Sequence, residues 1–78
     1  MKDKESILIS LKIERHELNI RINKLNKLKY DNIEEFKKLG SIMCQMLDTQ
    51  LEIMNSYFEI LTLRILYLEE NKYEKILY

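Results

Sequence analysis

The sequence contains no proline, alanine, valine or tryptophan, and it has one glycine, one cysteine and one histidine. The lack of proline and glycine excludes collagen, proline-rich linkers and β folds rich in turns. The single Cys44 excludes an internal disulfide, and one cysteine with one histidine excludes a standard structural zinc site within one chain. The chemistry of the chain therefore has to come from its other side chains.

The 78 residues carry 46% hydrophobic and 33% charged residues, with a net charge of zero. This composition predicts one small ordered domain over residues 1–78 rather than a disordered chain. The start MKDKESILIS has no long apolar run, so we expect no signal peptide. The most apolar stretch, residues 42–68, carries four charged side chains, which argue against a membrane span. We therefore expect a cytoplasmic protein.

Residues 5–29 are predicted to form one helix. Apolar side chains recur at three- and four-residue spacing along one face: Leu8, Leu11, Leu18, Ile22 and Leu25. Arg15 and Lys29 occupy two further positions of the same stripe. A second apolar line lies nearly opposite and contains Ile9, Ile13 and Ile20, with His16 inside it. A helix with two apolar faces needs two partners.

Residues 30–41 are predicted to connect the two long helices. We expect a short helical turn over residues 33–39, started by a capping box of either Asp31 with Glu34 or Asn32 with Glu35. Gly40 suits a position of positive φ after this turn. Ser41 is predicted to cap the next helix with its side chain.

Residues 41–70 are predicted to form the second long helix, which is apolar around most of its circumference. Its expected seam with the first helix contains Met43, Leu47, Gln50, Met54, Tyr57, Leu61, Arg64 and Leu68. A second apolar line contains Ile42, Met46, Ile53, Ile60 and Tyr67, and a third contains Leu51, Phe58 and Ile65. Residues 73–78 either extend the helix or fold back onto a partner.

These patterns together predict an all-α antiparallel two-helix hairpin, with Leu18 facing Met54 and Arg15 facing Tyr57. Such a hairpin uses one stripe of each helix and leaves about ten large apolar side chains bare, at ~1.5–3 kcal/mol each. We therefore expect the hairpin to assemble into a homo-oligomeric helical bundle. The residues expected at the subunit boundary are Ile9, Ile13 and Ile20, together with Phe58 or Ile65.

The two halves of the chain differ in charge. Residues 1–39 carry ten basic and seven acidic residues, whereas residues 40–78 carry three basic and six acidic residues. The first helix of one copy can therefore lie against the acidic second helix of another, although charges on a solvated surface are the simpler interpretation. The zero net charge argues against binding of duplex nucleic acid.

The sequence shows no pattern typical of an enzyme, a metal site or a cofactor site. It has no glycine-rich phosphate loop and no nucleophile with a matching histidine relay. His16 is more simply an interface histidine than an acid or base, and Cys44 is more simply a small core residue.

Polar side chains at seam positions are the most informative feature. Arg15, Gln50 and Arg64 stand where leucine or isoleucine would pack better, and Tyr57 belongs to the same set. Such residues either fix the register of the helices or bind a ligand. An anionic ligand with a flat ring would suit guanidinium, amide and phenol groups together. We expect Arg64 to be the most important of them, because the pairing places no acid directly opposite it.

The spacing resembles a family of small phage-encoded helical hairpins. The first helix fits E-x-x-E-L-x-x-x-I-x-K-L, and the second fits L-x-x-Q-L-x-x-M-x-x-Y-x-x-x-L-x-x-R-I. The match covers residues 11–66. The matching positions are Glu14, Glu17, Leu18, Ile22, Lys24, Leu25, Leu47, Gln50, Leu51, Met54, Tyr57, Leu61, Arg64 and Ile65.

That family is similar to the hairpin domain of phage anti-CBASS and anti-Thoeris sponge proteins. The resemblance implies a homo-oligomer, often a hexamer, that sequesters a cyclic nucleotide immune signal in the infected bacterial host without cleaving it. It also implies that Arg15, Lys24 and Arg64 hold phosphates and that Tyr57 stacks on a base or lines the pocket. The alternative from the apolar stripes is a structural or adaptor hairpin that docks on a host protein.

Overall fold

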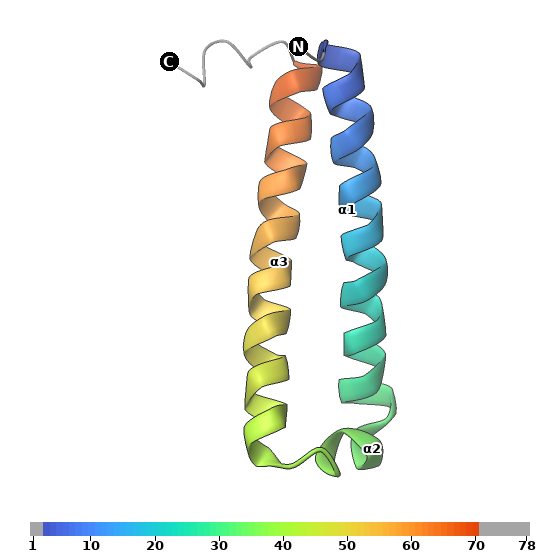
Figure 1. The fold of residues 1–78 in the computed structure, drawn as a ribbon, viewed down its shortest axis with the longest axis vertical. Helices are drawn as coiled ribbons and strands as arrows, with labels where there is room; N and C mark the ends of the chain where they lie inside the picture. The colour runs from blue at the N-terminus through green and yellow to red at the C-terminus, as the bar shows by residue number, and fades with distance from the viewer. Residues whose placement is uncertain (1–2, 71–78) are drawn as a thin grey trace.

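Two long antiparallel helices form the body of the chain, as the sequence predicts. The structure, a computed structural model, describes residues 3–70. Helix α1 spans Lys4–Asn26 and continues into a π-helical turn at Lys27–Asp31, α2 spans Ile33–Lys37, and α3 spans Ser41–Glu69. Figure 1 shows α1 and α3 side by side, with α2 crossing one end of the hairpin. The described part of the chain contains no strand, which confirms the all-α prediction.

The end of the first helix differs from the prediction. The helix widens into a π-helical turn, in which the Asn32 backbone N–H donates to the Lys27 carbonyl at 3.0 Å. The Asn32 side chain donates to the same carbonyl at 3.2 Å, so it turns back toward α1. No side chain caps α2, and the predicted capping box is therefore not formed.

The predicted role of Gly40 is confirmed, and that of Ser41 is wrong. Gly40 has φ +90°, in the region that favours glycine. Gly40 also occupies the position that precedes the first turn of α3, and its carbonyl accepts the Cys44 N–H at 3.0 Å. Ser41 is already the first helical residue, so its hydroxyl is not placed to cap the helix, and no side chain caps α3.

Replacing Gly40 with alanine is expected to destabilise the hairpin by about 1–3 kcal/mol, because φ +90° with ψ 156° is a backbone conformation that is almost exclusive to glycine. A Cβ there would meet no heavy atom within 4 Å, so backbone strain is the only cost. Urea denaturation followed by circular dichroism measures the change. Ser41→Ala is the matched control and should leave the midpoint nearly unchanged, because Ser41 makes no cap. An unchanged midpoint in Gly40→Ala would contradict this.

The core lies along one face of each long helix. The stripe predicted for α1 is confirmed, since Leu11, Leu18 and Ile22 are buried and Leu8 and Leu25 pack against them. On α3, large apolar residues that are buried or partly buried alternate at spacings of four and three: Leu47, Leu51, Met54, Phe58, Leu61, Ile65 and Leu68. This alternation is the pattern of a coiled-coil seam.

The seam predicted for α3 is therefore only half correct. Leu61 and Leu68 of the predicted seam are almost fully buried, but Gln50, Tyr57 and Arg64 are exposed. The third predicted line, Leu51, Phe58 and Ile65, takes their place in the seam. Ile65 is only 2% exposed within the single hairpin, so it has almost no surface left for the subunit boundary where it was expected.

The register also differs from the prediction. Arg15 faces Thr62 rather than Tyr57, because its guanidinium donates to the Thr62 hydroxyl. Lys29 and Asp48 form an ion pair at 2.7 Å near the turn, and the hydrogen bond that Lys29 donates to Asp48 raises the pKa of Lys29.

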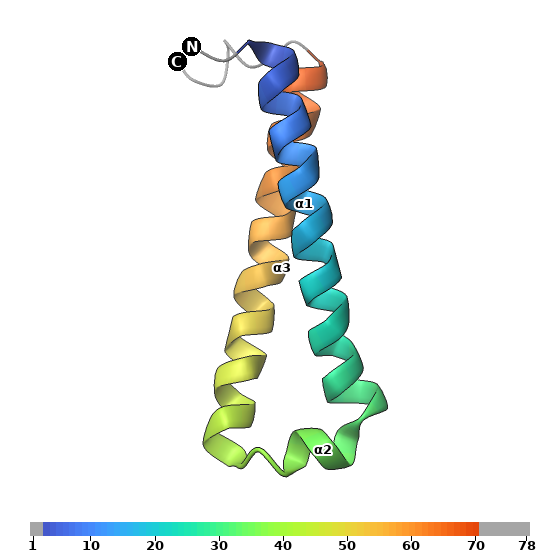
Figure 2. The same cartoon turned by 45° about the vertical axis from the view of Figure 1, so that its right-hand side comes forward.

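The hairpin is tightest at the end away from α2. Figure 2 shows the two long helices close together at that end and further apart toward α2. The burial agrees, since Leu61, Ile65 and Leu68 are at most 2% exposed. At the wider end, Phe36 of α2 is buried, and its carbonyl accepts a bond from the Cys44 thiol at 3.2 Å. Residues 73–78, for which two conformations were open, lie outside the described part of the chain.

Candidate functional site

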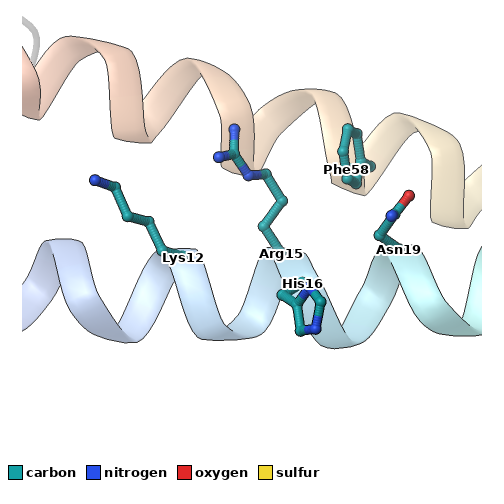
Figure 3. Close-up of a pocket in the computed structure, with 5 residues that line it drawn as sticks. All are labelled: Lys12, Arg15, His16, Asn19 and Phe58. Carbon is teal, nitrogen blue, oxygen red and sulfur yellow. The ribbon is translucent and has the colours of Figure 1, made fainter.

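An open depression of about 260 Å³ lies between α1 and α3 on one flank of the hairpin. Its lining consists of Lys12, Arg15, His16, Asn19 and Phe58. The first four lie on α1 at spacings of three, one and three residues, which places them on neighbouring positions of one helix surface. Figure 3 shows Lys12, Arg15 and Asn19 extending toward α3, and His16 pointing away from it.

Arg15 is the central polar group of this depression. It occupies a seam position of α1, where its half-buried guanidinium donates one long bond of 3.4 Å to the Thr62 hydroxyl. The Thr62 hydroxyl in turn donates a hydrogen bond to the Phe58 carbonyl at 3.0 Å. Within residues 3–70, no carboxylate forms a salt bridge with Arg15. Because a guanidinium carries five N–H donors, most of them remain available to an anion.

The neighbours of Arg15 add charge, a hydrogen-bonding amide and a ring. Lys12 forms a salt bridge with Glu69 at 3.0 Å, in which both side chains are about half exposed. An exposed pair of this kind contributes little stability, so the Lys12 ammonium can exchange its partner at small cost. Asn19 supplies an amide, and the partly buried Phe58 supplies an aromatic surface. The set suits an anionic ligand that carries a flat ring.

Tyr57 lies on the other flank of the hairpin. On α3, Tyr57 precedes the seam residue Phe58, whereas Thr62 follows the seam residue Leu61, so the two lie on opposite sides of the seam. The Tyr57 hydroxyl donates to the Glu14 carboxylate, and this bond raises the pKa of Tyr57. The predicted pairing of Arg15 with Tyr57 is therefore wrong.

The other predicted ligand residues do not join Arg15. Gln50 and Arg64 are exposed on α3 at the same helical position as Tyr57, and Gln50 contacts the Met54 sulfur at 3.8 Å. Arg64 was expected in the seam, but its side chain does not enter the core. Lys24 is exposed on α1, two residues after the buried Ile22. The predicted set is thus divided between separate surfaces.

Lys12 and Asn19 are depression residues that sequence reasoning missed. The signal was present, because both stand within one helical turn of Arg15 on the same side. The residues expected at a subunit boundary remain open on α1, where Ile9, Ile13 and Ile20 are 60%, 54% and 41% exposed. Whether they contact a second copy stays a prediction.

The described residues contain neither a metal cluster nor a membrane-spanning helix. Residues 3–70 contain no group of three or more histidine, cysteine or acidic side chains that could hold a metal ion. No helix among them has the length and apolar character needed to cross a membrane.

Comparison with known proteins connects this hairpin to one family. No curated protein and no solved structure matches the chain. The model of the Sequestin family matches residues 5–67, which include all of α3 except its last two residues and nearly all of α1. Sequestin-type proteins are phage anti-defence sponges for cyclic nucleotides. Because the match extends over most of the sequence, the chain belongs to the Sequestin family.

Proposed function

We propose that this chain acts in the cytoplasm of an infected bacterium as a phage anti-defence sponge, which sequesters a cyclic nucleotide signal without hydrolysing it. Membership of the Sequestin family supports a sequestering role. The observation that carries the proposal on this chain is the half-buried Arg15, which has no carboxylate salt bridge within the described residues. A buried guanidinium without an acid is costly unless a ligand neutralises it.

The side chains that line the depression match the chemical groups of a cyclic nucleotide. Its phosphodiester can bind in a bidentate manner to Arg15, with Lys12 as a second cation. The base can lie against the Phe58 ring, and the Asn19 amide can bond to a base edge or a sugar hydroxyl. Sequestration needs affinity alone, so this set requires no nucleophile or general base.

The exposed row on the other flank is a second candidate surface. Arg64 and Gln50 each lie seven residues, about two helical turns, from Tyr57 on α3. Lys24 is a further exposed cation on α1. These side chains could hold a second phosphate or base, particularly where two copies meet. We place them second because the Tyr57 hydroxyl is already bound to Glu14.

Self-assembly is the second part of the proposal. Large apolar side chains remain exposed along the outer faces of both long helices, including Ile13 on α1 and Ile53 on α3, which is 63% exposed. Contiguous apolar surface of this extent is typical of an interaction site. A homo-oligomer, such as the hexamer that the family resemblance implies, would cover it.

Arg15→Ala is expected to weaken binding by ~1.5–3 kcal/mol, the range for a charge-assisted hydrogen bond, which is a loss of roughly 10- to 150-fold in affinity. Calorimetry with a panel of cyclic mono-, di- and trinucleotides measures this. Arg21→Ala is the matched control, because Arg21 is an exposed arginine of α1 outside the depression. Circular dichroism checks that both variants keep their helices.

Two outcomes would contradict this site. Equal losses in Arg15→Ala and Arg21→Ala would indicate a general charge effect. A loss confined to Arg64→Ala would move the site to the flank that carries Tyr57 and Gln50. If no cyclic nucleotide binds the unmodified chain, the adaptor function gains support, because the outer apolar faces would then serve to dock a host protein.

A further inference from the structure

The outer face of α3 carries a second seam that the hairpin does not use. Its positions alternate at spacings of four and three residues, and we call them the outer α3 line: Ile42, Met46, Thr49, Ile53, Ser56, Ile60, Leu63 and Tyr67. All eight are exposed, and Ile42 is 73% exposed. The same alternation marks the buried seam on the opposite face of the helix. The outer α3 line therefore has the geometry of a helix–helix contact.

The outer face of α1 carries a shorter line of the same kind. We call its positions, which also alternate at spacings of four and three, the outer α1 line: Ile9, Ile13, His16, Ile20 and Asn23. All of them are exposed. Because the two lines share one periodicity, a helix of one copy can pack along a helix of another over several turns.

The charges of the two long helices favour one of the possible pairings. Helix α3 carries four acidic residues and one basic residue, whereas α1 carries five basic and three acidic residues. Antiparallel packing of two α3 helices would bring Glu52 and Glu59 of one copy toward the same residues of the other. Neither forms an ion pair within residues 3–70, so their charges are not already neutralised there. Pairing of α3 with α1 of another copy brings opposite charges together.

We propose that the outer α1 line of one copy packs antiparallel against the outer α3 line of a second copy. This inference rests on the self-assembly included in the proposed function. We choose the register in which large side chains of one line lie opposite small side chains of the other. In this register Ile13 lies opposite Ser56, and Ile20 lies opposite Thr49. A shallow, open depression of about 350 Å³ lies on the outer α3 line between Ile42 and Thr49.

This pairing also brings a second copy to the candidate ligand site. His16 belongs to the outer α1 line and lines the depression beside Arg15. An α3 helix that covers the outer α1 line therefore forms a rim of that depression. The ligand would then bind beside the contact between two copies rather than on an isolated hairpin.

Crosslinking of cysteine variants tests the pairing in the full chain. Cys44→Ser removes the native thiol and keeps a hydroxyl that can donate to the Phe36 carbonyl. In this background, Ile13→Cys and Ser56→Cys chains are mixed and treated with a short bismaleimide. We expect a covalent dimer in the mixture and little in either variant alone. Ile33→Cys mixed with Ser56→Cys is the matched control, because Ile33 is exposed on α2 outside both lines.

Each other outcome would overturn the pairing. Dimers of Ser56→Cys alone would indicate that α3 packs on α3, and dimers of Ile13→Cys alone would indicate that α1 packs on α1. Sedimentation of the Cys44→Ser chain separates these results from a failure of self-assembly itself. A monomer at micromolar concentration would overturn both the assembly and the pairing, whereas an oligomer without the mixed crosslink would overturn the pairing alone.

Discussion

Leu61→Ala is expected to destabilise the hairpin by about 2–5 kcal/mol, which is the usual cost of truncating a leucine in a packed core. Leu61 has no exposed surface, and it lies in the tight end of the seam with Ile65 and Leu68. Small domains have a total stability of only ~5–15 kcal/mol, so this loss removes a large share of it. Chemical denaturation followed by circular dichroism at 222 nm, a standard helix signal, measures the change in midpoint.

Leu39→Ala is the matched control for this measurement. It deletes the same atoms, but Leu39 is 45% exposed and lies between α2 and α3 rather than in the core. Its truncation should cost well under half as much, because less apolar surface is returned to water. Equal losses in the two variants would contradict the core described for the tight end of the hairpin.

The sequence predicts α1 well because only one of its stripes suits an intramolecular seam. Leu11, Leu18 and Ile22 alternate at the right spacing, and the opposite line is shorter and interrupted by His16. Polar residues between the two stripes leave little freedom in choosing the face. The helix boundary at residue 29 was less predictable, because the helix continues as a π-helical turn that has almost no sequence signal.

The face of α3 could not be predicted in the same way. This helix is apolar in several directions, so more than one of its faces can form a seam. The line of Leu51, Phe58 and Ile65 is fully apolar, whereas Gln50, Tyr57 and Arg64 place polar groups in the predicted seam. The two lines are adjacent, and moving from one to the other rotates the helix by only part of a turn. Tertiary packing decides the rotation, because it places the apolar Phe58 and Ile65 against the core.

The candidate site depends on this rotation and on the register. Arg15 was identified from the sequence because it is charged at a seam position, and the structure keeps it half-buried beside Thr62. Its partners could not be identified, because they depend on the length of the connection between the helices. In the structure Thr62 lies opposite Arg15, and the rotation of α3 places Tyr57 on the other flank, next to Glu14.

Ile13→Asp is expected to dissociate the proposed assembly while the hairpin stays folded. Ile13 is 54% exposed in the single chain, so an aspartate there remains hydrated and costs the monomer little. At a contact between copies, the same aspartate would be an unpaired charge beside apolar side chains, at a cost of several kcal/mol per site. Since each copy carries the substitution, the cost is repeated at every contact. Analytical ultracentrifugation measures the mass, and circular dichroism measures the helix content.

Ile33→Asp separates this effect from a general effect of added charge. It makes the same chemical change at a residue that is 47% exposed, but Ile33 starts α2 and lies outside both outer lines. A carboxylate in the first turn of a helix is compatible with the helix dipole, so the fold should be kept. We expect Ile33→Asp to retain the mass of the unmodified assembly while Ile13→Asp sediments as a monomer. An Ile13→Asp chain that keeps the full mass would show that the outer α1 line is solvent-exposed in the assembly, and the contact would then have to involve α3 alone.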